Sequence, residues 1–128
     1  DSIDELVCGA HLEGLPLNWQ LIERGAVLKQ HTQTSAHYLM YALAGGPPFR
    51  PGLIRDEAAG VAIEVEIWSM PKSEFGSFVA GIPAPLGIGK VQIADGSWVC
   101  GFICEPYGLE GSSDISALGG WRAYMAQR

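Results

Sequence analysis

Positive charge is scarce in this sequence. Eight Lys and Arg residues stand against fourteen Asp and Glu residues, which gives a formal net charge of -6 over 128 residues. Proteins that bind nucleic acid gather cations along the phosphates, so the composition excludes nucleic acid as an expected partner. A small anion would have to be held by local donors, such as backbone N–H groups or a single Arg, because the overall field opposes it.

Long apolar runs and targeting signals are also absent. No apolar run reaches the roughly 18 residues that a membrane span needs, and no basic segment followed by an apolar one opens the sequence. The three cysteines are an odd number, which favours a reducing compartment when no secretory signal is present. We therefore expect a cytoplasmic protein that does not contact a membrane.

Motifs for metal and cofactor chemistry are missing as well. The glycine-rich stretches fit neither the P-loop nor the dinucleotide-binding pattern, and no nucleophile-elbow motif is present. Cys100 and Cys104 lie four residues apart in a strand-like run, without a C-x-x-C pair or a neighbouring His. We predict no metal and no cofactor. The cysteines, with Cys8, are interpreted as buried structural thiols, and one reactive thiol is the alternative.

The length and apolar content indicate one globular domain, residues 1–128, with 48% hydrophobic residues. We predict strands over 6–10, 19–22, 26–32, 37–43 and 61–70, and a hairpin of 91–93 and 97–103. A frayed start at 1–5, a loop at 45–52, a helix from 71 to about 83 and a terminal helix or strand at 121–127 complete the elements. The predicted strands and helices do not alternate regularly, which favours an α+β fold with a barrel-like sheet.

Local signals refine three of these elements. Asp95-Gly96 is typical of a two-residue type I′ turn, which would close the hairpin. Ser69 is placed to cap the helix that Pro71 opens. The helix should bury one face, formed by Phe75, Phe78, Val79 and Ile82.

The loop from Gly9 to Gly14 is the first candidate for chemistry. A Gly at the end of a buried strand permits a sharp turn, and successive N–H groups in such a turn hold anions. His11 would lie at the lip of this turn. Either it is a hydrogen-bonded loop residue, or it performs acid–base chemistry on a bound ligand.

A carboxylate pair and a rigid loop are the other candidates. Glu64 and Glu66 share one face of an apolar strand, about 6.6 Å apart by strand rise. That face is either solvated, or buried with carboxylates that need a partner or a proton. The Pro/Gly-rich loop 82–89 is either a pocket wall or a connector. We predict that the loop 9–14, Glu66 and the loop 83–89 converge on one cavity; Arg55 and Arg122 are unplaced counter-charges.

Four segments together resemble a known family. They are GAHLEGLPLNWQL at 9–21, AIEVEIW at 62–68, IPAPLGIGKVQIADG at 82–96 and GGWRAY at 119–124. In this order they are similar to the C-terminal domain of allophanate hydrolase. The resemblance implies a γ-glutamylcyclotransferase-like fold: a small mixed β-barrel with one or two flanking helices, whose first strand ends in a ligand-holding loop.

The resemblance also implies a function. Allophanate hydrolases pair an amidase, which makes N-carboxycarbamate, with this domain, which takes that product to carbamate and carbon dioxide. It implies His11 or a protonated Glu66 as the proton donor. The substrate would be held by Gly9, Ala10, Leu12 and Asn18, with Pro85, Leu86 and Gly87 as the wall. The implied partners are a small anionic substrate, an amidase domain that is fused or separate, and a second copy in a homodimer.

Two alternatives stay open. In the cyclotransferase relatives the loop reads close to YGSN and a catalytic Glu lies in GELYEV, where this sequence has CGAH and VEIWSM. Glu66 fits that Glu, but Val65 replaces the preceding Gly and the loop lacks its Tyr, which speaks against a γ-glutamyl cyclotransferase. The second alternative is a non-catalytic assembly domain, for which the four tryptophans offer apolar contact area.

Overall fold

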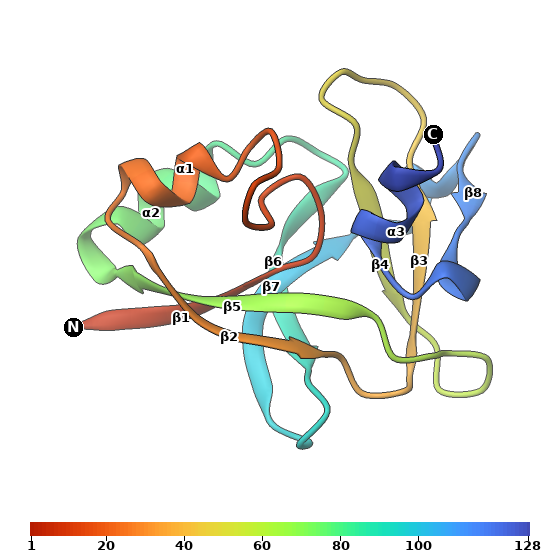
Figure 1. The fold of residues 1–128 in the computed structure, drawn as a ribbon, viewed down its shortest axis with the longest axis horizontal. Helices are drawn as coiled ribbons and strands as arrows, with labels where there is room; N and C mark the ends of the chain where they lie inside the picture. Colours follow the sequence, from red (N-terminus) through yellow and green to blue (C-terminus); the bar gives the residue numbers. More distant parts are fainter.

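The computed structural model describes residues 1–128 as two β-sheets with three short α-helices (Figure 1). The larger sheet has the strand order β2-β5-β1-β7-β6, and the smaller has the order β4-β3-β8. The strands are β1 (Ser2–Val7), β2 (Val27–Gln33), β3 (Tyr38–Ala42), β4 (Pro51–Arg55), β5 (Glu64–Pro71), β6 (Leu86–Gln92), β7 (Trp98–Cys104) and β8 (Ser113–Asp114). The helices are α1 (Trp19–Glu23), α2 (Lys72–Ala80) and α3 (Trp121–Ala126), with 3-10 turns η1 (Pro106–Leu109) and η2 (Ser116–Leu118).

The predicted α+β fold, mostly sheet with few helices, is confirmed. The two sheets do not join into one hydrogen-bonded ring, so "barrel" describes the shape only loosely. Figure 1 places α1 and α2 at one end of the molecule and the small sheet with α3 at the other. No helix is both long enough and apolar enough to cross a lipid bilayer. A single apolar cluster joins both sheets and all three helices; its fully buried members include Leu6, Leu12, Leu21, Met40, Ile63, Val65, Met70 and Val91.

The central strand β1 begins earlier than predicted. It pairs antiparallel with β5 from Ser2 onward and parallel with β7, so the expectation of a frayed start at 1–5 is wrong. The side chain of Glu5 is fully buried, and neither of its carboxyl oxygens has a hydrogen-bond partner. Burial raises the pKa of Glu5 to about 9. Glu5 is therefore uncharged at neutral pH, because a buried carboxyl without a counter-charge keeps its proton.

Strand β5 is buried on both faces. It lies between β2 and β1 in the sheet and begins at Glu64, three residues later than predicted. Val65 and Ile67 are buried on one face, and Glu66, Trp68 and Met70 are buried on the other. Glu66 is 2% exposed. The alternative in which this face is solvated is therefore wrong for Glu66, and its charge needs protein partners.

Two short segments differ from the predicted element type. Residues 19–22 belong to the helix α1 and not to a strand: Leu21 is buried, whereas Trp19 and Ile22 point to solvent. A four-residue apolar run does not distinguish a strand from one helical turn. The segment 121–127, left open between helix and strand, forms α3, which buries Trp121.

Two strands lie partly in segments that we predicted to be loops. β4 begins at Pro51, and a Cβ atom at Gly52 would lie 2.9 Å from the Cys104 sulfur of β7. β6 begins at Leu86 instead of Val91, and a Cβ atom at Gly89 would lie 2.7 Å from Ile103 Cδ1. In both strands the glycine allows another element to pack closely. The sequence does not distinguish such a glycine from one in a turn.

The hairpin of β6 and β7 is confirmed, but its turn is of another type. Gly96 has a φ of 91° and Asp95 does not have a positive φ, so the type I′ prediction is wrong. The Gly96 N–H donates to the Ile93 carbonyl, and the Ile93 N–H donates to the Ser97 carbonyl, both at 2.9 Å. This is the pattern of a type I turn followed by a left-handed glycine.

The helix α2 is confirmed with changes at its start and its buried face. Pro71 occupies the N-cap position, and no side chain caps it. The Ser69 hydroxyl, predicted as the cap, donates instead to Ser2 at 2.9 Å. Of the predicted apolar face only Phe78 is fully buried, while Phe75 and Ile82 pack partly against the core.

Candidate active site

The loop after β1 brings free N–H donors to a cavity. A Cβ atom at Gly9 would lie 2.4 Å from Pro51 Cδ, so only glycine permits this approach of the loop to β4. The backbone N–H groups of Gly9, Ala10 and His11 donate to no other group of the chain. All three residues line a small cavity of about 20 Å³. Unpaired N–H groups at a cavity are an anion-binding arrangement.

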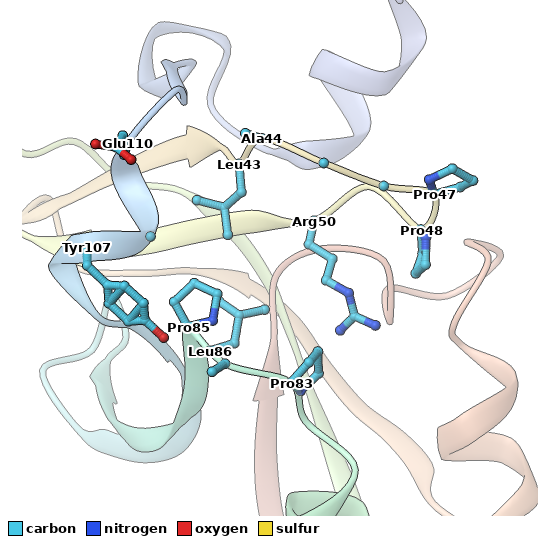
Figure 2. A pocket seen from close by; sticks show the side chains of 14 residues that line it. Leu43, Ala44, Pro47, Pro48, Arg50, Pro83, Pro85, Leu86, Tyr107 and Glu110 are labelled. Carbon is cyan, nitrogen blue, oxygen red and sulfur yellow. The ribbon is translucent and has the colours of Figure 1, made fainter.

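Arg50 supplies a positive charge beside these donors. It lines the small cavity and also a larger open cavity of about 500 Å³. Figure 2 shows its side chain extending into the space between Pro83 and Pro48. Arg50 takes part in none of the five ion pairs and donates no side-chain hydrogen bond, and burial lowers its pKa. An Arg stays charged nonetheless, so Arg50 is an unpaired cation facing two cavities.

His11 forms the third part of this site. The residue is 6% exposed, and its ring lies 5.0 Å from the ring of Phe102 and 5.4 Å from that of Phe78, measured between centroids. Its Nε2 lies 2.8 Å from Gln20 Oε1. Burial lowers the pKa of His11 to about 4, the hydrogen bond to Gln20 opposes this, and the charges of Arg50 and Arg24 add to the lowering. The imidazole is therefore neutral at pH 7 when the site holds no anion.

Cys8 lines the same small cavity. Burial and then the nearby Glu5 raise the pKa of its thiol to about 12. Since the thiolate is the reactive form, Cys8 remains a protonated structural thiol. Burial also raises the pKa of Cys104.

Glu66 lies outside the cavities. One carboxylate oxygen accepts the Glu13 N–H at 2.8 Å and the Trp68 indole N–H at 3.1 Å, and the other accepts from Arg122 at 2.9 Å. Glu66 lines none of the three cavities of the molecule. The prediction that it shares a cavity with the loops 9–14 and 83–89 is therefore wrong for Glu66, although parts of both loops do meet at Leu86.

Both predicted counter-charges have a definite place. Arg122 lies between the two carboxylates, since it also donates to Glu64 at 2.8 Å. His31 contacts the same Glu64 oxygen at 2.8 Å. Arg55 is elsewhere and pairs with Glu57.

The remaining predicted substrate-binding residues divide into two groups. Ala10, Pro85 and Leu86 line cavities. Leu12 donates its N–H to the Gly9 carbonyl at 3.0 Å, and its side chain is in the core. Asn18 donates its amide to the His11 carbonyl at 2.9 Å, and Gly87 lines no cavity. Leu12 and Asn18 therefore shape the loop, and neither lines one of the three cavities.

Sequence reasoning missed Arg50. It lies in GGPPFRPG, which we interpreted only as a shaped loop. The available signal was a cation within a rigid Pro/Gly segment of an acidic protein, where a lone Arg without a nearby carboxylate points to a bound anion.

Comparison with known proteins identifies the family of this chain. A solved γ-glutamyl cyclotransferase superposes with a TM-score of 0.56 over 82% of this chain and 68% of its own, at 15% identity, which shows a shared fold. The family model of the allophanate hydrolase C-terminal domain matches residues 3–126. The chain therefore belongs to the allophanate hydrolase C-terminal domain family.

Relatives carry this domain both within longer chains and by itself. The urea amidolyase of Saccharomyces cerevisiae is 46% identical over 97% of this chain, which spans 7% of that protein. The Kluyveromyces lactis allophanate hydrolase structure has a TM-score of 0.96 at 41% identity and covers 99% of this chain, which spans 21% of that one. A uropathogenic E. coli-specific protein has a TM-score of 0.91 at 34% identity, with 100% of this chain and 98% of its own covered.

Proposed function

We propose that this chain decarboxylates N-carboxycarbamate to carbamate and carbon dioxide. The bond between nitrogen and one carboxyl carbon breaks, its electron pair stays on nitrogen, and nitrogen takes up one proton as carbon dioxide leaves. Such a site needs donors for the retained carboxylate and an acid near the nitrogen. The observation that carries the proposal is that one cavity is lined by Arg50, by His11 and by the residues 9–11, whose N–H groups have no partner in the chain.

The local donors explain how an acidic protein binds a dianion. Arg50 and the three residues with unpaired N–H groups line the same small cavity, and no carboxylate of the protein is paired to Arg50. Charge-assisted hydrogen bonds to a carboxylate are about twice as strong as neutral ones. In the proposal, Arg50 and the Gly9–His11 backbone hold the carboxylate that remains on carbamate.

His11 becomes an acid only when the dianion binds. In the free site burial and Arg50 keep the pKa of His11 at about 4. A dianion beside the ring compensates Arg50 and favours imidazolium, so binding is accompanied by proton uptake. With Nε2 engaged by Gln20, Nδ1 is the nitrogen that gains the proton and gives it to the substrate nitrogen as carbon dioxide departs.

The two alternatives have weaker support. A cyclotransferase would use Glu66 as its base, but both Glu66 oxygens already accept hydrogen bonds from three groups, away from the cavities. Formation of 5-oxoproline from γ-glutamyl substrates would restore that reading. A purely structural domain would leave the pathway rate unchanged on mutation of His11 and Arg50, yet lower it on deletion of the domain.

The test measures carbon dioxide release from intermediate that a separate amidase generates. Because spontaneous decarboxylation proceeds in parallel, each rate is compared with that of amidase alone. We expect added chain to accelerate release, His11→Ala to reduce the acceleration at least about 100-fold, and Lys29→Ala, in an exposed ion pair, to preserve it. A rate with added chain equal to that of amidase alone would overturn the proposal.

A further inference from the structure

One peptide segment of the candidate site is held from both sides by an ion pair. The Glu13 N–H donates to Glu66 Oε1 at 2.8 Å, and the Glu13 carbonyl accepts from Arg122 Nη2 at 2.7 Å. The same Arg122 nitrogen donates to Glu66 Oε2 at 2.9 Å. Glu66, Arg122 and the main chain of Glu13 thus form a closed hydrogen-bonded ring, which we name the Glu13 clamp.

The environment of the clamp makes its geometry costly to change. The side chain of Glu66 is 3% exposed and that of Arg122 is 33% exposed. A carboxylate removed from water to this extent needs all its hydrogen bonds, and loss of one partner is strongly destabilising. A third oxygen–guanidinium contact, from Arg122 Nη1 to Glu64 at 2.8 Å, fixes the plane of the guanidinium.

The start of α3 is bound to the same strand. The Glu64 N–H donates to the Gly119 carbonyl at 2.8 Å. A Cβ atom at Gly120 would lie 2.8 Å from Glu64 Cβ, so glycine permits the close contact that brings Arg122 over β5. The C-terminal segment and the loop after β1 are therefore joined through β5, although they lie more than 100 residues apart in sequence.

The clamp adjoins the turn that carries the free donors. The Leu12 N–H closes this turn on the Gly9 carbonyl at 3.0 Å, and Glu13 follows directly. We propose that Glu66 and Arg122 are positioning residues that fix the direction of the Gly9–His11 N–H groups, and that α3 is thereby part of the anion site. This inference rests on the proposed function and assigns Glu66 a role different from proton transfer.

The probe is malonate, in which CH₂ replaces the NH of N-carboxycarbamate. Its binding to the whole chain is followed by NMR of the backbone amides, and carbon dioxide release is measured in parallel. We expect Arg122→Ala to weaken malonate binding about tenfold and to raise KM with kcat little changed, because the binding that is lost holds the ground state and the transition state equally. His11→Ala should instead lower kcat.

Two further variants separate positioning from general loss of structure. Arg122→Lys keeps one cationic donor and should recover part of the affinity, and Lys29→Ala, in an exposed pair on the same sheet, should match the unmodified chain. Partial unfolding lowers the active fraction and leaves KM unchanged. Folded Arg122→Ala with KM and malonate affinity equal to those of Lys29→Ala would overturn the inference.

Hydrogen exchange distinguishes failure of the clamp from failure of the proposed function. If the unmodified chain neither binds malonate nor releases carbon dioxide, the proposed function fails. The clamp is then judged by amide exchange at Leu12 and Glu13, whose N–H groups are hydrogen-bonded; this exchange should be faster in Arg122→Ala than in Lys29→Ala. Equal exchange in the two variants would remove the positioning role as well.

Discussion

Arg50 and His11 line the same small cavity, and the charge of one acts on the other. Burial, and then Arg50, keep the pKa of His11 at about 4, so the free site holds one cation and one neutral imidazole. Both features favour a bound anion: Arg50 lacks a partner, and His11 gains a proton only when negative charge arrives.

Replacement of Arg50 should weaken anion binding without unfolding the protein. Arg50 makes no ion pair and no side-chain hydrogen bond, so Arg50→Ala breaks no internal contact of that kind. We expect malonate affinity to fall about tenfold to a hundredfold, with the melting temperature nearly unchanged. Arg50→Lys keeps the charge, so its malonate affinity should lie between those of the unmodified chain and Arg50→Ala. Calorimetric titration measures this, and unchanged affinity in Arg50→Ala would remove Arg50 from the site.

Binding of the dianion should take up a proton. Because the pKa of free His11 is about 4 and a bound dianion raises it, affinity should increase as the pH falls through the pKa of the complex toward 4. Calorimetry at pH 7 in two buffers of different ionisation enthalpy gives the number of protons taken up. We expect a positive value for the unmodified chain and none for His11→Ala. Equal values for the two would show that His11 does not titrate with the ligand.

Gly9 and Gly87 should respond differently to the same substitution. A Cβ atom at Gly9 would lie 2.4 Å from Pro51 Cδ, whereas none of the neighbouring atoms lies within 4 Å of a Cβ at Gly87. Gly9→Ala should cost about 1–3 kcal/mol of unfolding free energy and reduce malonate binding. Gly87→Ala should leave both unchanged. Chemical denaturation and titration check this, and lost binding in Gly87→Ala would restore the predicted contact of Gly87 with substrate.

Glu5 should make stability depend on pH in the neutral range. Its pKa in the folded state, about 9, lies above the ordinary value of 4.5. The contribution of Glu5 to the free energy of unfolding is therefore full below pH 4.5 and is lost as the pH rises toward 9. Between pH 5 and pH 8 this amounts to on the order of 4 kcal/mol of unfolding free energy. Glu5→Gln should remove the slope, and Asp4→Asn, at the neighbouring half-buried position, should keep it. Equal slopes for the unmodified chain and Glu5→Gln, measured by urea unfolding, would contradict a buried neutral carboxyl.

Sequence periodicity predicted the elements whose burial is regular. The strand through Val65 and Ile67, the hairpin to Phe102 and the helix that buries Phe78 are all present. Periodicity did not predict the strand residues Glu5, Gly52 and Gly89. Glu5 is a buried carboxyl without a partner, and the two glycines allow close packing of strands. These positions depend on long-range contacts, which local patterns do not contain.

The candidate site was predictable only in part for the same reason. The turn at Gly9 and the His11 position follow from a glycine at the end of a buried strand, and both line the cavity. Arg50 comes from a distant segment, and the three partners of Glu66 come from Glu13, Trp68 and Arg122. A carboxylate on an apolar strand signals that partners exist, but its sequence neighbours do not tell whether those partners are substrate or protein.

Proton donation by His11 is tested by the rate of carbon dioxide formation from amidase-generated N-carboxycarbamate with the unmodified chain and with His11→Ala. Both proteins are compared at saturating intermediate, with folding verified and the rate of amidase alone subtracted. We predict a clear acceleration by the unmodified chain and a loss of at least about 100-fold in that acceleration for His11→Ala. Equal acceleration by the two proteins would contradict proton donation by His11, and no acceleration by either would contradict decarboxylation itself.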